Sequence, residues 1–393
     1  MPSSTSVRHF SVVTETYPPE VNGVALTVAR LVSGLRAHGH TVSVIHSGRH
    51  GRGGARSRDV TAVRGLQLPG GHEWQLGFPA GRLLHGCWTR RRPHAIYVAT
   101  EGPLGYSAVR TARRLRIPVV SGFHTNFDGY VRHYGAAALE RPLFSYLRHF
   151  HNRTDRTLVP TAELRDRLRT LGFRNLGVLH RGVDTALFDP ARRSSALRAA
   201  WEASHDELVV LHVGRIAPEK NVPLVIEAYR RMQRVCATVR LVIVGDGPLR
   251  LALERTNPDV VFTGVRRDEW LAEHYASADV FLFPSATETF GNVTVEAMAS
   301  SLAVVAYDYA AARLHIRHGE SGVLVPCGDA RAFVAEAAML VSRPLTLQRM
   351  RRRARESVIP VGWESVVERF ESILSGAGAR GDETVVAEGR AAS

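Results

Sequence analysis

Short apolar runs alternate with helical segments along this chain, and the alternation occurs twice. In the first half, the runs that have the character of buried strands are residues 9–14, 41–46, 94–100, 117–123, 158–160 and 176–184. In the second half, the corresponding runs are residues 207–213, 239–245, 260–264, 279–284, 303–308 and 322–326. Strands that alternate with helices in this way form parallel sheets with helices on both faces. The sequence therefore predicts an α/β protein with two facing doubly wound, Rossmann-like parallel-sheet domains.

The two series are separated by residues 185–206, which contain several charged residues and no strand-like run. We therefore expect an N-terminal domain at residues 1–190 and a C-terminal domain at residues 191–362. The last helical pattern is at residues 363–374. Residues 376–393 are mostly small and polar, which indicates a disordered tail.

The net charge and the arginine clusters bear on which partners the protein could bind. A net charge of +14 permits attraction to an anionic membrane, but no base-stacking or groove-reading motif accompanies it, which argues against nucleic acid. Arginine clusters at residues 90–92, 110–116 and 349–355 would form a membrane-binding face only if they lay together, and most such runs are solvated.

The cysteines and the apolar segments point to a cytoplasmic protein. The 3 cysteines are far apart and lack CxxC spacing, so we expect neither zinc nor a disulfide framework and favour a reducing cytosol. The N-terminus lacks the apolar segment of a signal peptide, and no run approaches the ~18–20 apolar residues that span a bilayer. We expect any membrane contact to be peripheral, at the inner face of the cell membrane.

Residues 284–300, PSATETFGNVTVEAMAS, follow a strand and lead into a helix. Ligands of open α/β sheets bind at the carboxyl ends of strands, beside helix N-termini. Gly291 lets the backbone approach such a ligand, and the free N–H groups of the first helical turn offer an anion site. Glu288 lies in the loop, within reach of ligand hydroxyls, whereas Glu296 lies in the helix. The stretch predicts a ligand with both phosphate and hydroxyl groups, for which a sugar nucleotide is the obvious candidate.

Two cations follow the strand that ends at Gly214. Arg215 and Lys220 occupy a strand-to-helix loop at a sheet edge, and Lys220 is the only lysine of the chain. Cations there would neutralise the charge that develops on a diphosphate leaving group, and no metal-ligand cluster is visible that would do so instead. The alternative, two solvated cations near a helix start, stays open at this point.

Two other loops contain glycines after strands. PEVNGV places Gly23 at the start of a helix, where the backbone could face the same phosphates. Residues 245–248, GDGP, lack the third glycine of GxGxxG, and a proline at the first helical position favours ordinary helix capping there.

Polar and aromatic residues gather after the strands that end near positions 100 and 123. His124 directly follows one strand and could donate a hydrogen bond or transfer a proton, although a structural histidine is an equally good interpretation. Glu101 follows the other strand, and Asn126 and Tyr130 add to the density. These residues suggest a site for a hydroxyl-rich acceptor, with a solvated loop as the alternative.

Together, these motifs resemble the GT-B fold glycosyltransferases of the large retaining family 4. The resemblance extends from YPPEVNGV to about Leu374, and its most specific part is the E-x7-E pattern of Glu288 and Glu296. GRIAPEKN, HRGVDTALF and VGDGP agree with it, and TEGPLGYSA and FHTNFDGYVRHYG are similar to bacterial mannosyl- and sulfoquinovosyltransferase-like enzymes that glycosylate lipids. One departure is ASSLAVVA, where Ser301 and Ala303 stand in place of the family's glycine and proline.

The resemblance implies a role for each matching residue. Arg215 and Lys220 would neutralise the donor diphosphate, Glu288 would contact the transferred sugar, and His124 would lie near its anomeric carbon. Glu296 would bind the ribose. The donor-binding set that the resemblance implies is Gly23, Gly214, Phe290, Gly291, Asn292 and Glu296.

The resemblance also implies the reaction and the partners. We expect a retaining hexosyltransferase that uses GDP-mannose or a UDP-sugar and needs no metal or other cofactor. The nucleotide sugar would bind the C-terminal domain, and a lipid or glycan acceptor would bind the N-terminal one, with Glu101, Asn126 and Tyr130 as candidate acceptor residues. The last helix, residues 363–375, would pack back on the N-terminal domain.

Other functions stay open on the sequence alone. A nucleotide-sugar epimerase or a phosphorylase could use the same architecture, because a fold does not fix a function. A phosphorylase would ordinarily carry a lysine that holds pyridoxal phosphate, and Lys220 is already placed in a phosphate loop. A non-catalytic protein that binds a membrane surface by its charge is the third alternative. The nucleotide base is also open, although Asp268 could accept hydrogen bonds from guanine.

Overall fold

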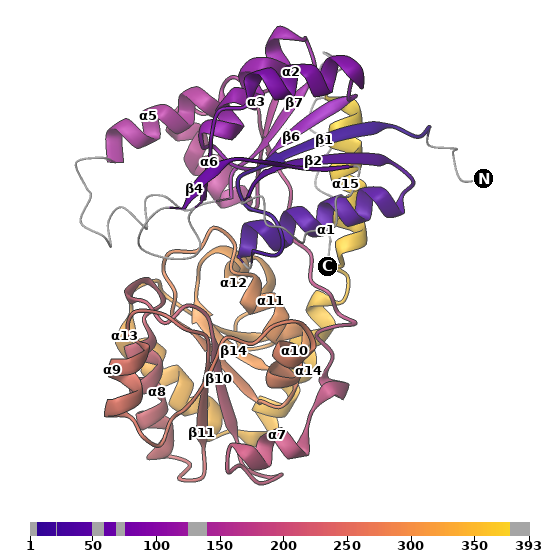
Figure 1. The fold of residues 1–393 in the computed structure, drawn as a ribbon. Coiled ribbons are helices and arrows are strands. Elements are labelled where there is room, and N and C mark those ends of the chain that lie inside the picture. The colour runs from indigo at the N-terminus through magenta and orange to yellow at the C-terminus, as the bar shows by residue number, and fades with distance from the viewer. Residues whose placement is uncertain (1–5, 21, 49–58, 68–74, 125–139, 378–393) are drawn as a thin grey trace, which may run out of the picture.

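The computed structural model describes two α/β lobes, which lie one above the other in Figure 1. The described residues are 6–20, 22–48, 59–67, 75–124 and 140–377. The N-terminal lobe is built on a seven-stranded sheet in the order β3-β2-β1-β6-β7-β8-β9. Its strands are β1 (His9–Thr14), β2 (Thr41–Ser47), β3 (Val60–Val63), β6 (Ala95–Val98), β7 (Val119–Gly122), β8 (Arg156–Val159) and β9 (Leu176–Val178).

All neighbouring strands of this sheet are parallel, so each connection has to cross over the sheet. The helices of the lobe are α1 (Gly23–Ala37), α2 (Gly81–Arg90), α3 (Pro103–Arg114), α5 (Glu140–His151) and α6 (Ala162–Thr170). A small antiparallel pair, β4 (Gly65–Gln67) and β5 (Gln75–Gly77), lies beside the sheet.

The C-terminal lobe repeats the plan with a six-stranded parallel sheet in the order β12-β11-β10-β13-β14-β15. Its strands are β10 (Val209–Val213), β11 (Arg240–Val244), β12 (Val261–Gly264), β13 (Val280–Phe283), β14 (Ala303–Tyr307) and β15 (Gly322–Val325). Its helices are α7 (Ser195–Ala200), α8 (Val222–Gln233), α9 (Arg250–Thr256), α10 (Asp268–Ala276), α11 (Asn292–Ala299), α12 (Ala310–His315), α13 (Ala330–Val341) and α14 (Pro344–Val358), with short 3-10 turns at Pro190–Arg192 and Pro218–Lys220. Every residue of β10, β13 and β14 is buried, as expected for strands covered on both faces.

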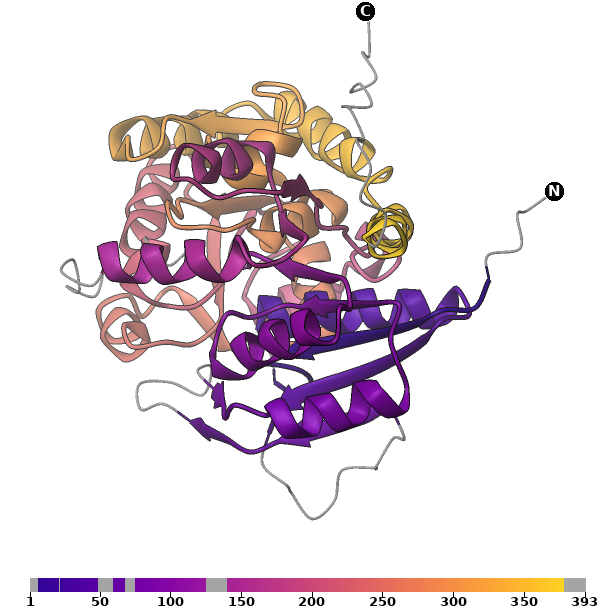
Figure 2. The ribbon, with the colours of Figure 1, turned by 90° about the horizontal axis from the view of Figure 1, so that it is seen from above.

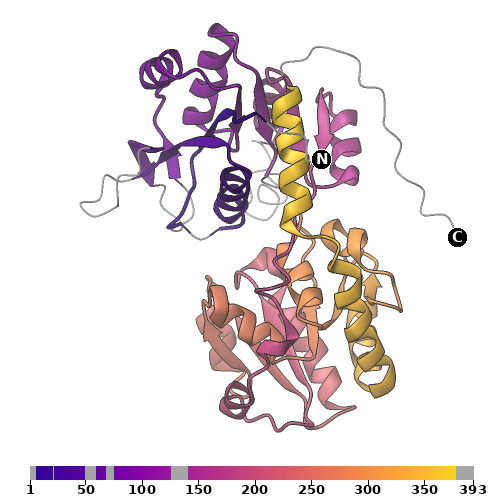
Figure 3. The ribbon, with the colours of Figure 1, turned by 90° about the vertical axis from the view of Figure 1, so that its right-hand side faces the viewer.

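The chain passes between the lobes twice, and the two passages touch. Val183, on the way down, forms a parallel bridge with Gly362, on the way back, and its N–H donates to the carbonyl of Val361 at 3.0 Å. The last helix, α15 (Trp363–Gly376), then packs along α1 of the N-terminal lobe. Figure 3 shows α15 in yellow beside that lobe, and Figure 2 views it nearly end-on.

Close packing of α15 depends on a glycine in α1. A Cβ atom at Gly34 would lie 2.3 Å from a methyl group of Val367, so only glycine fits there. Val367, Phe370 and Leu374 join Phe10 and Leu31 in one buried apolar cluster. The C-terminal helix is therefore part of the N-terminal core.

Each sheet has one point at which the strand order reverses direction. In the N-terminal sheet it lies between β1 and β6, and in the C-terminal sheet between β10 and β13. Loops that leave the carboxyl ends of two such strands diverge and leave a crevice, where ligands of open α/β sheets bind. The loops after these four strands therefore define where a site is expected.

The two parallel sheets with alternating helices confirm the predicted fold class. The sequence analysis did not predict several elements, namely β3, β4, β5, α2, α5, α7, α12 and α13. Ser301, which stands where the family has glycine, adopts the left-handed conformation with φ of 60°. Glycine adopts this conformation without strain. Of the tail expected at residues 376–393, Gly376 still belongs to α15, and residues 378–393 lie outside the described residues.

Candidate active site in the cleft between the lobes

A cleft of about 550 Å³ lies between the two lobes, at the carboxyl ends of both sheets. Its walls include residues from the loops after all four strands that flank the two reversal points. Of the residues that the sequence predicted for the site, those that line this cleft are Gly23, Glu101, His124, Gly214, Arg215, Lys220, Glu288, Phe290, Gly291 and Asn292. The fold thus brings together residues that are up to 269 positions apart in the chain.

The C-terminal wall holds an ion pair at its centre. The Lys220 ammonium donates a hydrogen bond to the Glu288 carboxylate, and Ser285 Oγ donates to the same oxygen at 2.7 Å. Both charged side chains are mostly buried, with 19% and 14% of their surface exposed. Arg215, from the same loop as Lys220, lies 3.5 Å from the carboxylate of Glu219. Two cations and one carboxylate therefore face the cleft from the ends of β10 and β13.

The loop that carries the two cations rests on the loop after β11. A Cβ atom at Gly245 would lie 1.9 Å from the carbonyl oxygen of Gly214, and one at Gly247 would lie 2.4 Å from that of Ile216. The N–H of Ile216 donates to the Asp246 carbonyl at 2.8 Å. The glycines of GDGP thus support the cation loop from behind, which agrees with a structural role for this motif.

The loop after β13 brings its backbone to the cleft through Gly291. This residue caps the N-terminus of α11 with φ of 91°, a conformation that glycine adopts without strain. Phe290 beside it is 1% exposed and packs into the core, which anchors the loop. The first turn of α11 consequently points its N-terminal end, with its partial positive charge, at the cleft.

The N-terminus of α1 meets the cleft from the opposite lobe, but most of its first amides are already bonded. Asn22 Oδ1 accepts from the N–H groups of Val24 and Ala25, at 3.1 and 2.8 Å. A Cβ atom at Gly23 would meet only Arg181 Nη1, at 3.7 Å. Packing against the described residues therefore does not require a glycine at position 23. The lack of a side chain there instead leaves open space at the cleft.

His124 lies at the end of β7 with both ring nitrogens engaged. Arg181 Nη2 lies 3.4 Å from Nδ1, and the Tyr97 hydroxyl lies 2.5 Å from Nε2. A guanidinium can only donate, so Nδ1 accepts and Nε2 carries the proton. Burial, reinforced by the nearby Arg181 charge, lowers the pKa of His124 to about 3. The imidazole is therefore neutral and has no free lone pair with which to take a proton.

The N-terminal wall presents two buried carboxylates, Glu15 after β1 and Glu101 after β6. Glu15 Oε1 accepts from the N–H of Leu104 at the start of α3, at 3.0 Å. Burial, and next the Glu101 charge, raises the pKa of Glu15 to about 7. Glu101 Oε1 lies 3.2 Å from His151 Nε2, so one of its oxygens is turned to the interior. This wall can accept hydrogen bonds from hydroxyl groups, and it carries no cation of its own at these two strand ends.

Glu296 differs from the other predicted residues because it is not part of the cleft wall among the described residues. Its Oε2 accepts a hydrogen bond from the Tyr275 hydroxyl at 3.0 Å. Burial raises the pKa of this carboxyl to about 7. Glu296 lies further along α11 than the cleft-lining Asn292, on the side that faces α10.

Asn126 and Tyr130, the other two predicted acceptor residues, lie outside the described residues. Two charged residues of the cleft lining, Glu15 and Arg181, were missed by the sequence analysis. Glu15 directly follows the first predicted strand, so its position was a signal of the same kind as that of Glu101. Arg181 stands within HRGVDTALF, a motif that was identified without its arginine being singled out.

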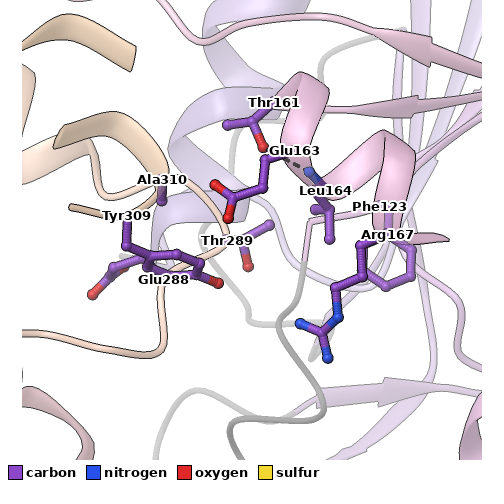
Figure 4. Close-up of a pocket in the computed structure, with 9 residues that line it drawn as sticks. All are labelled: Phe123, Thr161, Glu163, Leu164, Arg167, Glu288, Thr289, Tyr309 and Ala310. Carbon is purple, nitrogen blue, oxygen red and sulfur yellow. Dashed lines mark hydrogen bonds between the residues drawn. The ribbon is translucent and has the colours of Figure 1, made fainter. Parts of the chain in front are cut away.

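A smaller pocket shares Glu288 and Thr289 with the main cleft and is also lined by both lobes (Figure 4). Thr161 and Leu164 of the α6 region line it from the N-terminal lobe. The residues that complete its lining are Phe123, Glu163, Arg167, Tyr309 and Ala310. An ion pair at 2.9 Å between Arg313 and Glu163 joins the lobes near this pocket.

Among the residues that the structure describes, no helix is both long and apolar enough to cross a membrane.

Comparisons with known proteins match both lobes to one group of enzymes. A family model described as Glycosyltransferase Family 4 matches residues 21–187, and one described as Glycosyl transferases group 1 matches residues 207–343. A GDP-mannose-dependent alpha-mannosyltransferase of Mycobacterium tuberculosis (strain CDC 1551 / Oshkosh) is 34% identical over 368 residues, which cover 92% of this chain and 94% of that protein. An alpha-monoglucosyldiacylglycerol synthase of Streptococcus pneumoniae is 28% identical over 75% of this chain and 70% of its own length. The crystal structure of Anabaena HepE in complex with UDP superposes with a TM-score of 0.75 at 18% identity, covering 94% of this chain and 100% of that one.

Proposed function

The chain belongs to glycosyltransferase family 4 and is a glycosyltransferase with the GT-B fold, and from this premise we propose that it moves a hexose from a nucleotide-diphosphate sugar to a hydroxyl group of a lipid or lipid-linked glycan. GDP-mannose is the first candidate donor and a UDP-sugar the second, because relatives and a structural neighbour are named for GDP-mannose and UDP. We further propose that residues 191–362 bind the donor, and that residues 1–190 with residues 363–375 bind the acceptor.

The observation that carries this proposal is the Lys220–Glu288 ion pair at the reversal point of the C-terminal sheet. A donor diphosphate beside it would compete for the Lys220 ammonium and draw that charge away from Glu288. The freed carboxylate could then accept hydrogen bonds from the hydroxyls of the sugar. Arg215 and Lys220 would stabilise the negative charge that builds up on the leaving diphosphate, a contribution that preorganised groups make without further reorganisation.

We propose that the reaction retains the anomeric configuration. The bond between the anomeric carbon and the diphosphate oxygen breaks, and the acceptor oxygen bonds to that carbon on the same face. The acceptor proton passes to the leaving phosphate oxygen. His124 acts in this scheme by position and not as a base, because its pKa is lowered to about 3 and both ring nitrogens are engaged.

A panel of nucleotide sugars tests the donor assignment. A ligand that binds only the folded state raises its stability by RT ln(1 + [L]/Kd), so we expect GDP-mannose or one UDP-sugar to raise Tm more than the others do. Transfer to a lipid extract, with the anomeric configuration of the product read by NMR, would complete the assignment. Inversion at the anomeric carbon would contradict the retaining mechanism. Release of nucleotide without acceptor, with formation of a new sugar isomer, would favour an epimerase.

The N-terminal lobe also supports a proposal about location: peripheral association with an anionic membrane on the cytoplasmic side. Exposed arginines 82, 110, 113 and 114 lie on the adjacent helices α2 and α3. Leu83 and Phe78 are 39% and 51% exposed in the same region. Charged and apolar side chains together are what an interfacial surface requires.

Vesicle sedimentation tests this surface. We expect binding to vesicles that contain phosphatidylglycerol, loss of binding at high salt, and weaker binding of Arg110→Glu/Arg114→Glu. Arg352→Glu/Arg353→Glu, at two exposed arginines of α14 in the other lobe, changes the net charge by the same amount, so it is the matched control and should bind like the wild type. Equal losses in both variants would mean that net charge matters and that this face does not.

A further inference from the structure

Arg181 lies at the junction of the cleft and the two chain passages between the lobes. It precedes Val183, which bridges to Gly362. Gly182 between them packs against the returning chain so closely that a Cβ atom there would lie 2.8 Å from the backbone of Trp363. The backbone of Arg181 is therefore fixed where the lobes join, while its side chain reaches into the cleft.

The guanidinium of Arg181 is buried, with 7% of the residue exposed. Burial lowers the pKa of Arg181 to about 10, so the group stays charged at neutral pH. None of the described carboxylates lies within ion-pair distance of it, and Glu288 attracts it only from further away. A buried charge without a counter-charge is costly, and this one lies in a cleft that is open to ligands.

The hydrogen bonds of Arg181 leave much of its capacity unused. Nη1 donates to Asn292 Oδ1 at 3.3 Å and Nη2 to His124 Nδ1 at 3.4 Å, which are long contacts to neutral acceptors. Nε has no partner among the described residues. A guanidinium has five N–H donors arranged in a planar fork that suits phosphate. The site therefore has the charge, the donors and the access that an anion needs.

The neighbours of the guanidinium indicate which anion it binds. Asn292 is the first residue of α11, whose N-terminal end favours negative charge. The guanidinium carbon of Arg181 lies 5.9 Å from the centroid of the Phe290 ring. A Cβ atom at Gly23 would lie 3.7 Å from Nη1, so the open space at Gly23 and the guanidinium border the same volume. Arg215 and Lys220 face this volume from the other wall.

We propose that Arg181 is a third cationic ligand of the donor diphosphate and contacts the terminal phosphate from the junction between the lobes. This inference rests on the proposed function, because it requires a nucleoside diphosphate donor. An anionic group on the acceptor offers the same chemistry to a guanidinium, so the experiment has to distinguish the two sources.

Calorimetric titration of GDP and GMP into the wild type, Arg181→Met and Arg181→Lys makes that distinction, with UDP and UMP as the second pair. GMP lacks the terminal phosphate, so a residue that binds this phosphate contributes to the affinity for GDP and not to that for GMP. We expect Arg181→Met to lower the affinity for GDP at least about tenfold and the affinity for GMP less than about twofold. The affinities of Arg181→Lys should lie between those of the wild type and Arg181→Met. Arg30→Gln is the matched control, because Arg30 lies near the same junction and is paired with Asp184 at 2.8 Å.

Thermal unfolding without ligand separates this role from a structural one. Loss of a buried charge that has no counter-charge among the described residues should leave the Tm of ligand-free Arg181→Met unchanged or raised, while the Tm increase on addition of GDP shrinks. Lower ligand-free stability together with a wild-type ratio of GDP to GMP affinity would overturn the proposal. So would unchanged GDP affinity with a raised KM for the acceptor, which would place the anion on the acceptor. If the wild type bound neither GDP nor UDP, the proposed function itself would fail.

Discussion

The C-terminal wall of the cleft presents two cations and a carboxylate to the open space, whereas the N-terminal wall keeps its carboxylates bound to the protein. Both walls lie at the point where the strand order of their sheet reverses. On the C-terminal side, Lys220 and Glu288 neutralise each other and can part when a ligand arrives. On the N-terminal side, Glu15 is held by a helix amide and Glu101 by a buried histidine. In the proposed function, the same topology thus supports a wall that exchanges partners with a charged donor and a wall that offers fixed acceptors to hydroxyl groups.

Removal of the Lys220 charge from the C-terminal wall should have the largest effect on sugar transfer. We expect Lys220→Met to lower kcat/KM by about 10²–10³-fold, because the leaving diphosphate loses a preorganised cation and Glu288 loses its ion pair with Lys220. Arg230→Gln, which breaks an exposed ion pair with Asp259 elsewhere in the same lobe, should retain activity and serves as the control. Steady-state kinetics with circular dichroism as the test of folding would decide. Near-normal turnover of Lys220→Met would mean that the ion pair is structural.

Burial raises the pKa of Glu296, behind the C-terminal wall, to about 7, as it does that of Glu15 in the N-terminal wall. A substitution at Glu296 can test whether this raised pKa affects stability. A carboxyl whose pKa is raised on folding stabilises the protein at low pH, and this stability is lost as pH rises through about 7. Glu296→Gln removes the titration, so its free energy of unfolding relative to wild type should rise between pH 5 and pH 8 by about 1–3 kcal/mol. Denaturant unfolding at both pH values measures this. A pH-independent difference would show that Glu296 ionises normally.

Glu15 should distinguish the two walls most directly. We expect Glu15→Gln to raise the KM for the acceptor by about tenfold and to leave the Kd of the donor unchanged, because a strong hydroxyl acceptor is replaced by a weaker one on one wall only. The amide oxygen can still accept from the N–H of Leu104, so the fold should persist. Equal losses for donor and acceptor would contradict the division of roles between the walls.

The smallest effect is expected at Ser301, behind the C-terminal wall. Its φ of 60° follows the C-terminus of α11, where glycine is the unstrained choice. Ser301→Gly should therefore stabilise the protein by about 0.5–1 kcal/mol without altering transfer. Ser300→Gly is a close control for the backbone effect, because Ser300 has φ of −80° and glycine relieves no strain there. Lower stability of Ser301→Gly would indicate that its side chain makes a contact worth more than the strain.

The walls also differ in how far they could be predicted. The C-terminal wall is formed by two short segments that directly follow strands, so position along the chain predicted that Lys220, Glu288 and Gly291 would lie at the sheet edge, where they line the cleft. The role of Glu15 depends on the position of α3, whose first turn reaches it from 89 positions away. Arg181 is informative because it is buried and has no carboxylate at ion-pair distance in the described part of the chain, which a linear pattern does not reveal. Most strands were predicted because parallel strands are continuously apolar. In contrast, β3 is a partly buried edge strand, and β4 and β5 form a separate two-stranded sheet.

The position of α15 has a consequence for synthesis of the protein. The N-terminal lobe is made first, yet Val367, Phe370 and Leu374 of its core are among the last described residues to leave the ribosome. Until they emerge, the apolar surface around Phe10 and Leu31 has no cover. A chain truncated or stalled before α15 would therefore expose an apolar surface on the part made first, and the core of that part is complete only after residues 363–376 have been made.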